Sequence, residues 1–134
     1  MADQVISITE TSANYAEKQA VRKVVWTWKC TDAGAVADQT AAGQINKTSH
    51  KYTGIIYRLI TDPTDGPTDN YGVTVLDDDG YDVLMGAGAN RDTTNTEQVL
   101  WSSLGICLDS QLRLNISAAG NAKSGKVILY IKPN

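Results

Sequence analysis

The residues of this chain that could take part in chemistry are few, and the first is its single histidine, His50. It follows Ser49 in a polar stretch, residues 46–51, so the pair could be read as a base and a nucleophile. A serine nucleophile also needs a strained turn that presents its hydroxyl and a set of oxyanion donors, and no such motif surrounds Ser49. We therefore expect His50 to be a solvent-exposed loop residue that is available to a partner, and we expect no catalysis.

Acidic residues gather in the run Asp77-Asp78-Asp79-Gly80, with Asp82 close behind. Clustered carboxylates at a turn can bind Ca²⁺, but this run lacks the twelve-residue spacing and the closing glutamate of an EF-hand loop. Aspartate and glycine also tolerate the positive φ angles of tight turns between strands. The run predicts a solvent-exposed turn, with a bound cation as the alternative.

The stretch from Gly86 to Arg91 has the glycine spacing with which a phosphate-binding loop begins. A dinucleotide-binding loop has a third glycine or alanine at the place of Arg91 and continues into a helix. Here the polar residues 92–96 follow, which is loop composition. We expect an irregular connection without a nucleotide or any other cofactor, in which Asn90 and Arg91 are candidates for contact with a partner.

Two cysteines, Cys30 and Cys107, are too few for the Cys/His spacing of a zinc site, so no metal is expected. Both lie in apolar, strand-like runs, where a free cysteine packs as a small buried hydrophobe; a disulfide is the alternative.

The net charge of −3 and the pI near 5.0 argue against nucleic acid as a partner. No apolar run is long enough for a membrane span, so a membrane partner is not expected either.

The elements that must position these residues are strands, because apolar residues recur at every second position. Between residues 23 and 31 the even positions are apolar and the odd positions are mostly polar, and this period returns over 112–117 and 127–131. Further strands are predicted over 5–9, 54–61, 71–76, 81–85 and 98–101. Short strands separated by turns indicate one all-β domain, an antiparallel β-sandwich or a jelly-roll-like β-barrel.

Turn chemistry separates the predicted strands. Residues 32–34 can close a hairpin into residues 35–40, and residues 62–67, with two prolines and a glycine, are expected to end the preceding strand. Residues 14–21 could form one or two helical turns, but a loop is favoured because so short a helix is marginal.

Three tyrosines, Tyr52, Tyr71 and Tyr81, could stack on sugars if they are exposed. The chain has no phenylalanine, so tryptophan and tyrosine must also supply the aromatic volume of the core. Packing in the core is therefore the favoured interpretation, with Tyr52 kept as a candidate for contact with a partner.

Turn and strand segments follow one another from Tyr57 to Pro63, Pro67 to Asp77, Asp79 to Leu84 and Gly88 to Arg91, and residues 111–114 and 119–131 extend the series. This succession, which covers about residues 20–132, resembles small virion proteins of tailed bacteriophages. It contains no catalytic signature.

The resemblance implies a capsid decoration, or cement, protein that binds the outside of the assembled head shell, often as a trimer. Its partners would be the phage major capsid protein and other copies of the chain, and it would be located in the virion after synthesis in the bacterial cytoplasm. A tail or fibre adhesin is one alternative, and a carbohydrate-binding β-sandwich module is another. A small hydrolase built on carboxylates around Asp79 is the third.

The chain is predicted to have two parts. Residues 1–19 form an N-terminal strand or arm, and residues 20–134 form the sandwich or barrel domain. As an arm, Val5, Ile6 and Ile8 would contact a shell protein while the backbone adds a strand to its open edge. The alternative is the first strand of the domain's own sheet.

Overall fold

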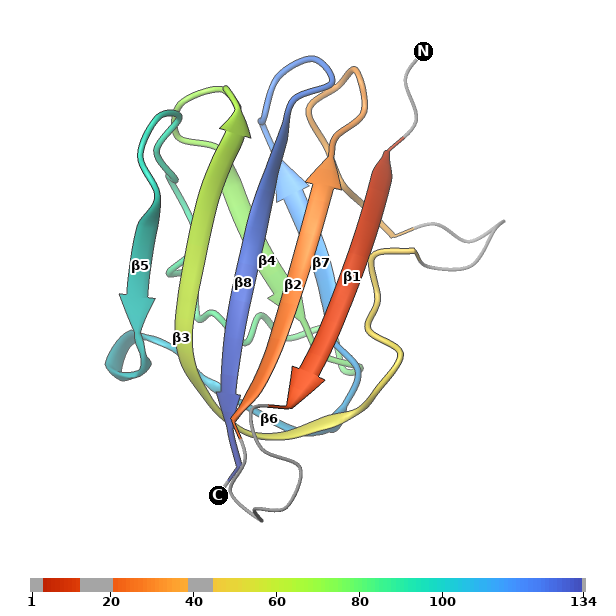
Figure 1. The fold of residues 1–134 in the computed structure, drawn as a ribbon, viewed down its shortest axis with the longest axis vertical. Helices are drawn as coiled ribbons and strands as arrows, with labels where there is room; N and C mark the ends of the chain where they lie inside the picture. The colour runs from red at the N-terminus through yellow and green to blue at the C-terminus, as the bar shows by residue number, and fades with distance from the viewer. Residues whose placement is uncertain (1–3, 13–20, 39–44, 134) are drawn as a thin grey trace.

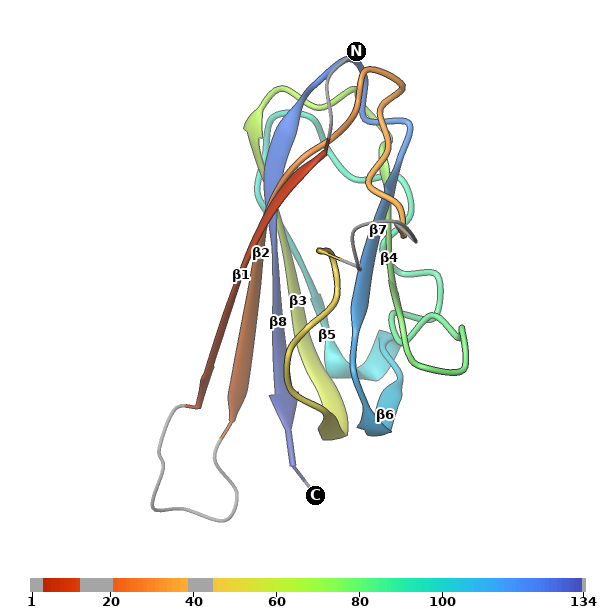
Figure 2. The same cartoon turned by 90° about the vertical axis from the view of Figure 1, so that its right-hand side faces the viewer.

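The computed structural model describes residues 4–12, 21–38 and 45–133, which form two layers of antiparallel strands (Figures 1 and 2). One layer is a six-stranded sheet and the other a two-stranded sheet. The prediction of an all-β, antiparallel domain is confirmed. Of the two predicted architectures the sandwich fits, because the described strands do not close into a barrel.

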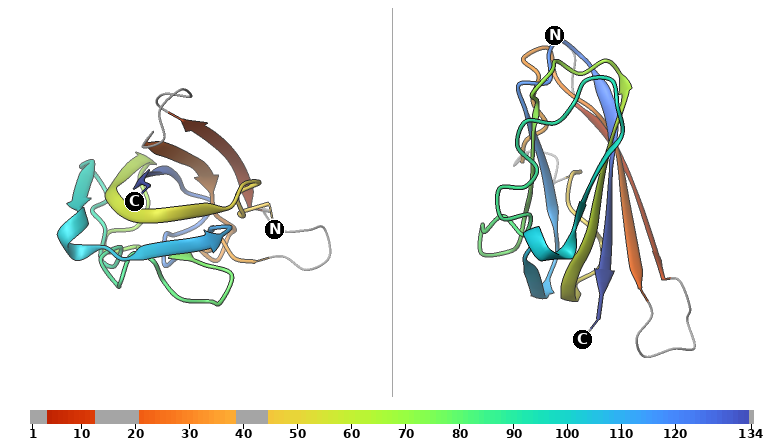
Figure 3. Two further views of the ribbon diagram at one scale, coloured as in Figure 1. Left: turned by 90° about the horizontal axis from the view of Figure 1, so that it is seen from below. Right: turned by 90° about the vertical axis from the view of Figure 1, so that its left-hand side faces the viewer.

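The larger sheet has the strand order β1-β2-β8-β3-β5, and β6 pairs with the beginning of β3. Its strands are β1 (Val5–Ser12), β2 (Arg22–Lys29), β3 (Tyr52–Asp65), β5 (Glu97–Leu100), β6 (Ile106–Ser110) and β8 (Ser124–Lys132). The smaller sheet pairs β4 (Gly72–Leu76) with β7 (Arg113–Ser117). A short 3₁₀ helix, η1 (Trp101–Ser103), separates β5 from β6. Seen from below, β6 and the start of β3 run side by side (Figure 3).

The core lies between the two sheets and is filled by strands whose side chains are alternately buried and exposed. In β2 the inward side chains are Val24, Trp26 and Trp28, which are at most 1% exposed. The aromatic rings of Trp28 and Tyr71 lie 5.8 Å apart and join the two layers. Full burial of a large apolar side chain is worth about 1.5–3 kcal/mol, so the two-residue period seen in the sequence is also the energetic basis of the fold.

Strand β1 pairs with β2 over its whole length, from Val5 opposite Lys29 to Ser12 opposite Arg22. Residues 5–12 therefore form a strand of the domain's own sheet. Ile6 and Ile8 pack against the core from this strand, whereas Val5 is 61% exposed.

The predicted strand over 81–85 is wrong, because this segment forms a series of turns with a single bridge between Leu76 and Asp82. The carboxylate of Asp82 accepts hydrogen bonds from the backbone N–H groups of Val75, Leu84 and Gly86. Local bonds of this kind compete with the pairing of strands, and here they fold the backbone into turns.

Two predictions about turns, at residues 62–67 and 32–34, also differ from the structure. Strand β3 continues through Pro63 to Asp65, with an irregularity in its register to β8 between Asp62 and Asp65 that accommodates the proline. The turn at residues 32–34 forms, but no hairpin strand follows over the described residues 35–38, where Val36 makes an isolated bridge to Ile116 in the smaller sheet. The candidate helix over 14–21 falls on a segment that lies, up to residue 20, outside the described residues.

Most of the predicted core side chains are buried as expected. Tyr52 and Tyr71 are 7% and 0% exposed, so packing is confirmed for both, while Tyr81 is 74% exposed. Cys30 and Cys107 are free and buried, which confirms the first interpretation and excludes the disulfide. Burial raises the pKa of the Cys107 thiol to about 11.

Candidate binding surface

Large apolar side chains are exposed together at the edge of the larger sheet where β5, η1 and β6 follow one another. Leu100 and Trp101 are 53% and 56% exposed, and Ile106 and Leu108 are 57% and 69% exposed. With Tyr57 and Met85 they form what we call the apolar edge, which contains six of the nine large apolar or aromatic side chains that are exposed in the described part of the chain. A large exposed apolar patch of this kind commonly marks a site of interaction with another molecule.

The pairing of β5 and β6 with β3 brings these side chains together. Leu100 lies opposite Arg58, and Ile106 lies opposite Ile55. Between these two pairs, the backbone N–H of Ile56 donates a hydrogen bond to the Gly105 carbonyl at 3.0 Å. The connection through η1 is therefore fixed against β3 rather than standing away from it.

The remaining two members flank this connection. Tyr57 occupies an irregularity in β3, where the register to β8 shifts between Ile56 and Arg58, and it is 42% exposed. Such a bulge re-aims side chains that would otherwise alternate. Met85 lies on the other side, where a Cβ atom placed on Gly105 would come within 3.2 Å of its Cγ.

Two of the predicted contact residues, His50 and Tyr52, lie together beside Glu10 of β1. The Tyr52 hydroxyl donates to Glu10 Oε1 at 2.6 Å, and the backbone N–H groups of Ser49 and His50 donate to the two carboxylate oxygens at 3.0 and 3.1 Å. Partial burial alone would raise the pKa of Glu10, but these hydrogen bonds outweigh it and lower the pKa below the ordinary value. Burial and the adjacent carboxylate raise the pKa of Tyr52. The cluster fastens the loop before β3 to β1.

The other predicted pair, Asn90 and Arg91, lies in a loop that follows the edge of β4. Arg91 forms a bridge with Tyr71, and its guanidinium Nη1 lies 3.7 Å from Glu97 Oε1. A Cβ atom on Gly88 would lie 2.1 Å from the Val73 carbonyl oxygen, so this glycine is required for packing against β4. The segment is an irregular connection, as predicted.

Carboxylates of the turn at residues 77–80, which we call the acidic turn, accept hydrogen bonds from the surrounding backbone. Asp77 Oδ1 accepts the N–H groups of Asp79 and Tyr81 at 3.0 and 2.9 Å, and Gly80 adopts the positive φ of +87°. Among the residues described, no group of three or more His, Cys, Asp or Glu side chains is arranged to hold a metal ion. The predicted solvent-exposed turn is confirmed.

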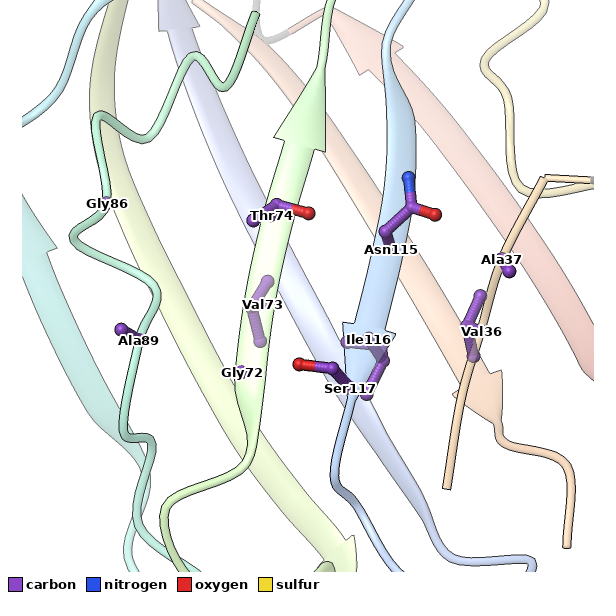
Figure 4. Close-up of a pocket in the computed structure, with 10 residues that line it drawn as sticks. All are labelled: Val36, Ala37, Gly72, Val73, Thr74, Gly86, Ala89, Asn115, Ile116 and Ser117. Carbon is purple, nitrogen blue, oxygen red and sulfur yellow. The ribbon is translucent and has the colours of Figure 1, made fainter. Parts of the chain in front are cut away.

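A groove of about 380 Å³ crosses the outer surface of the smaller sheet (Figure 4). Thr74, Asn115 and Ser117 project from β4 and β7, between Gly86 and Ala89 on one side and residues 36–37 on the other. The lining contains neither aromatic nor ionisable side chains. It therefore offers no stacking surface for a sugar and no general acid or base.

The predicted contact residues thus fall into three places, and the apolar edge is not among them. Val5, Ile6 and Ile8 lie on β1, at the opposite end of the strand order from β5. The one sequence signal for the apolar edge is the apolar run at 104–108, which has the composition of an ordinary buried strand. The sequence does not indicate that Ile106 and Leu108 face solvent.

No protein-family model, curated protein or solved structure matches the chain. In the part of the chain that the structure describes, no helix is long and apolar enough to cross a membrane. The inference of function therefore depends on the surfaces of the fold itself.

Proposed function

We propose that the chain is a non-catalytic adhesion subunit of a bacteriophage capsid, a decoration protein that binds the outer surface of the head shell and stabilises it. Its partners in this role are the major capsid protein and further copies of the chain, assembled as a trimer. Closed oligomers of identical chains suit the symmetry axes at which shell subunits meet.

The apolar edge is the observation that supports this proposal. Trp101 and Ile106 are each more than half exposed, so that burying the rest of either side chain against a partner is favourable by about 1–2 kcal/mol. Tryptophan and tyrosine, here Trp101 and Tyr57, are enriched among the residues that contribute most of the binding energy at protein interfaces. They stand on strands and on a connection fixed to β3, so the surface is preformed and little ordering is needed on binding.

The carbohydrate-binding alternative needs neighbouring aromatic side chains that are free to stack on a sugar ring. Trp101 and Tyr57 are the exposed aromatic side chains of the apolar edge, and its other four members are the aliphatic or thioether side chains of Leu100, Ile106, Leu108 and Met85. A sugar ring can stack its C–H groups on an aromatic ring, but the hydroxyls around it need hydrogen-bond partners, which the aliphatic neighbours do not supply. We therefore favour a protein partner.

Co-sedimentation with phage heads that lack the protein tests the proposal. Wild-type chain is expected to pellet with the heads, and Trp101→Ala together with Ile106→Ser is expected to weaken the association at least tenfold, the equivalent of about 1.4 kcal/mol. Tyr81→Ala is the control, since Tyr81 is more exposed than either residue, at 74%, but follows the acidic run 77–80. Failure of the wild type to pellet, or equal loss of binding in the control, contradicts the proposal.

A further inference from the structure

The outer face of the larger sheet carries a concentration of positive charge. Figure 1 looks directly onto this face, and no described segment crosses in front of it. The basic side chains that alternate outward from β2, β3 and β8 form what we call the cationic face: Lys23, Lys29, Arg58, Lys126 and Lys132. Only two acidic residues of these strands, Asp62 and Asp65, accompany them. The cationic face has a net positive charge, whereas the whole chain has a net charge of −3. The rest of the molecule is therefore more negative than −3.

The register of the strands places an apolar row in the middle of these charges. Val25 lies opposite Ile128, and Ile128 lies opposite Ile60, all three being outward-facing and partly exposed. Two residues along the strands on one side, Lys23, Tyr130 and Arg58 form the next row. On the other side the row consists of Thr27, Lys126 and Asp62, so one lysine and one aspartate lie next to each other there. Rows two residues apart are separated by about 7 Å. The face is therefore an apolar stripe with two cations along one side and a lysine next to an aspartate along the other.

The tyrosines of this face are already engaged by its cations. Lys23 Nζ and the Arg58 guanidinium each lie 5.7 Å from the centre of the Tyr130 ring, and Lys132 Nζ lies 5.5 Å from the centre of the Tyr57 ring. Sheets that bind single-stranded nucleic acid stack bases on free aromatic faces. A ring that is flanked by cations from both neighbouring strands does not offer such a face. The apolar stripe also has no counterpart in a phosphate backbone.

We propose that the cationic face docks an acidic protein surface whose carboxylates border an apolar centre. This inference rests on the proposed function and names the chemistry of the partner. The face is continuous with the apolar edge, because Leu100 lies opposite Arg58 and Ile106 lies opposite Ile55. Cations of the face then steer and orient the partner, while apolar contacts at the edge hold it.

Binding of defined probes by fluorescence anisotropy tests this inference. The probes are a labelled peptide of alternating leucine and glutamate, labelled poly-L-glutamate and a labelled single-stranded oligothymidylate. The Leu/Glu peptide is expected to bind most tightly of the three, with an affinity that falls as salt rises from 50 to 300 mM. Lys23→Glu combined with Lys126→Glu is expected to weaken its binding roughly tenfold or more.

The matched control changes the same charges elsewhere, with Lys47→Glu combined with Lys51→Glu in the loop before β3, and its binding is expected to stay within twofold of wild type. Thermal melts of both variants verify that they are folded. Equal weakening in both variants, tightest binding to the oligothymidylate, or no binding of either peptide overturns the inference. These outcomes are distinct from the co-sedimentation result. If the chain pellets with heads but does not bind the Leu/Glu peptide, the proposed function stands and the inference of an acidic partner is contradicted.

Discussion

Removal of the Glu10 carboxylate is expected to destabilise the fold in a way that depends on pH. Glu10 accepts one partly buried hydrogen bond from Tyr52 and two solvent-exposed ones from backbone amides. A hydrogen bond to a charged group contributes about 1.5–3 kcal/mol, and we take the lower end because solvent screens this carboxylate. The two exposed bonds add a few tenths of a kcal/mol each. Glu10→Ala should therefore lower the free energy of unfolding by about 2 kcal/mol at pH 7.

The corresponding change in melting temperature follows from the size of the domain. An unfolding entropy of about 2.1 cal/mol/K per residue over 134 residues converts 2 kcal/mol to a decrease of about 7 °C. Glu10→Gln, which keeps one acceptor oxygen but no charge, should lose about half of this. Urea denaturation at pH 7 and at pH 3 measures both variants.

The sign of the pH dependence follows from the lowered pKa of Glu10. The carboxylate contributes stability above its ordinary pKa of 4.5, and this contribution is lost as the pH falls through the lower pKa of the folded state. The gap between wild type and Glu10→Gln should therefore shrink at pH 3. Tyr52→Phe is the control, since it should be less harmful in the Glu10→Gln background than in wild type. A gap that is the same at both pH values, or no gap at pH 7, refutes the reasoning.

Three further outcomes follow from contacts elsewhere in the fold. Gly88→Ala places a methyl group against the Val73 carbonyl and should cost about 3 kcal/mol in urea denaturation, whereas Gly86→Ala, with open space around it, should cost about 1 kcal/mol; equal costs would contradict the packing described. Native protein should leave Cys107 unlabelled by a thiol reagent over minutes, since the thiol is buried and its pKa is about 11, and prompt labelling before unfolding would show that it is accessible. Asp82→Ala should speed hydrogen exchange at the three backbone amides that it holds and lower stability by about 1–2 kcal/mol; unchanged exchange rates would show that the turns do not depend on the carboxylate.

The strands that sequence analysis places correctly are those with one buried face and one solvent-exposed face. In β2 the inward Val24, Trp26 and Trp28 alternate with side chains that are mostly polar, so the period is visible without any knowledge of the partner strands. The predicted strand over 81–85 has a similar mixture of side chains. There the outcome was decided by Asp82, whose hydrogen bonds to the backbone are not visible in a hydrophobic pattern.

The candidate surfaces were less accessible to prediction than the fold. The apolar edge consists of Ile106, Leu108 and their neighbours, which read as ordinary core residues because composition does not specify which face of a strand meets solvent. The cationic face is concealed by the net charge of −3, since Lys23 and Lys126 are far apart in sequence and come together only through the pairing of β2 with β8. Both surfaces arise from register, which a single sequence does not reveal.

Imaging of intact phage particles that contain the chain, at a resolution that resolves its strands, tests the central claim most directly. The proposed function predicts density for the sandwich on the outer surface of the head at a symmetry axis, with Trp101 and Ile106 facing the shell or a neighbouring copy. Particles without the chain, or particles in which the apolar edge faces solvent, would contradict it.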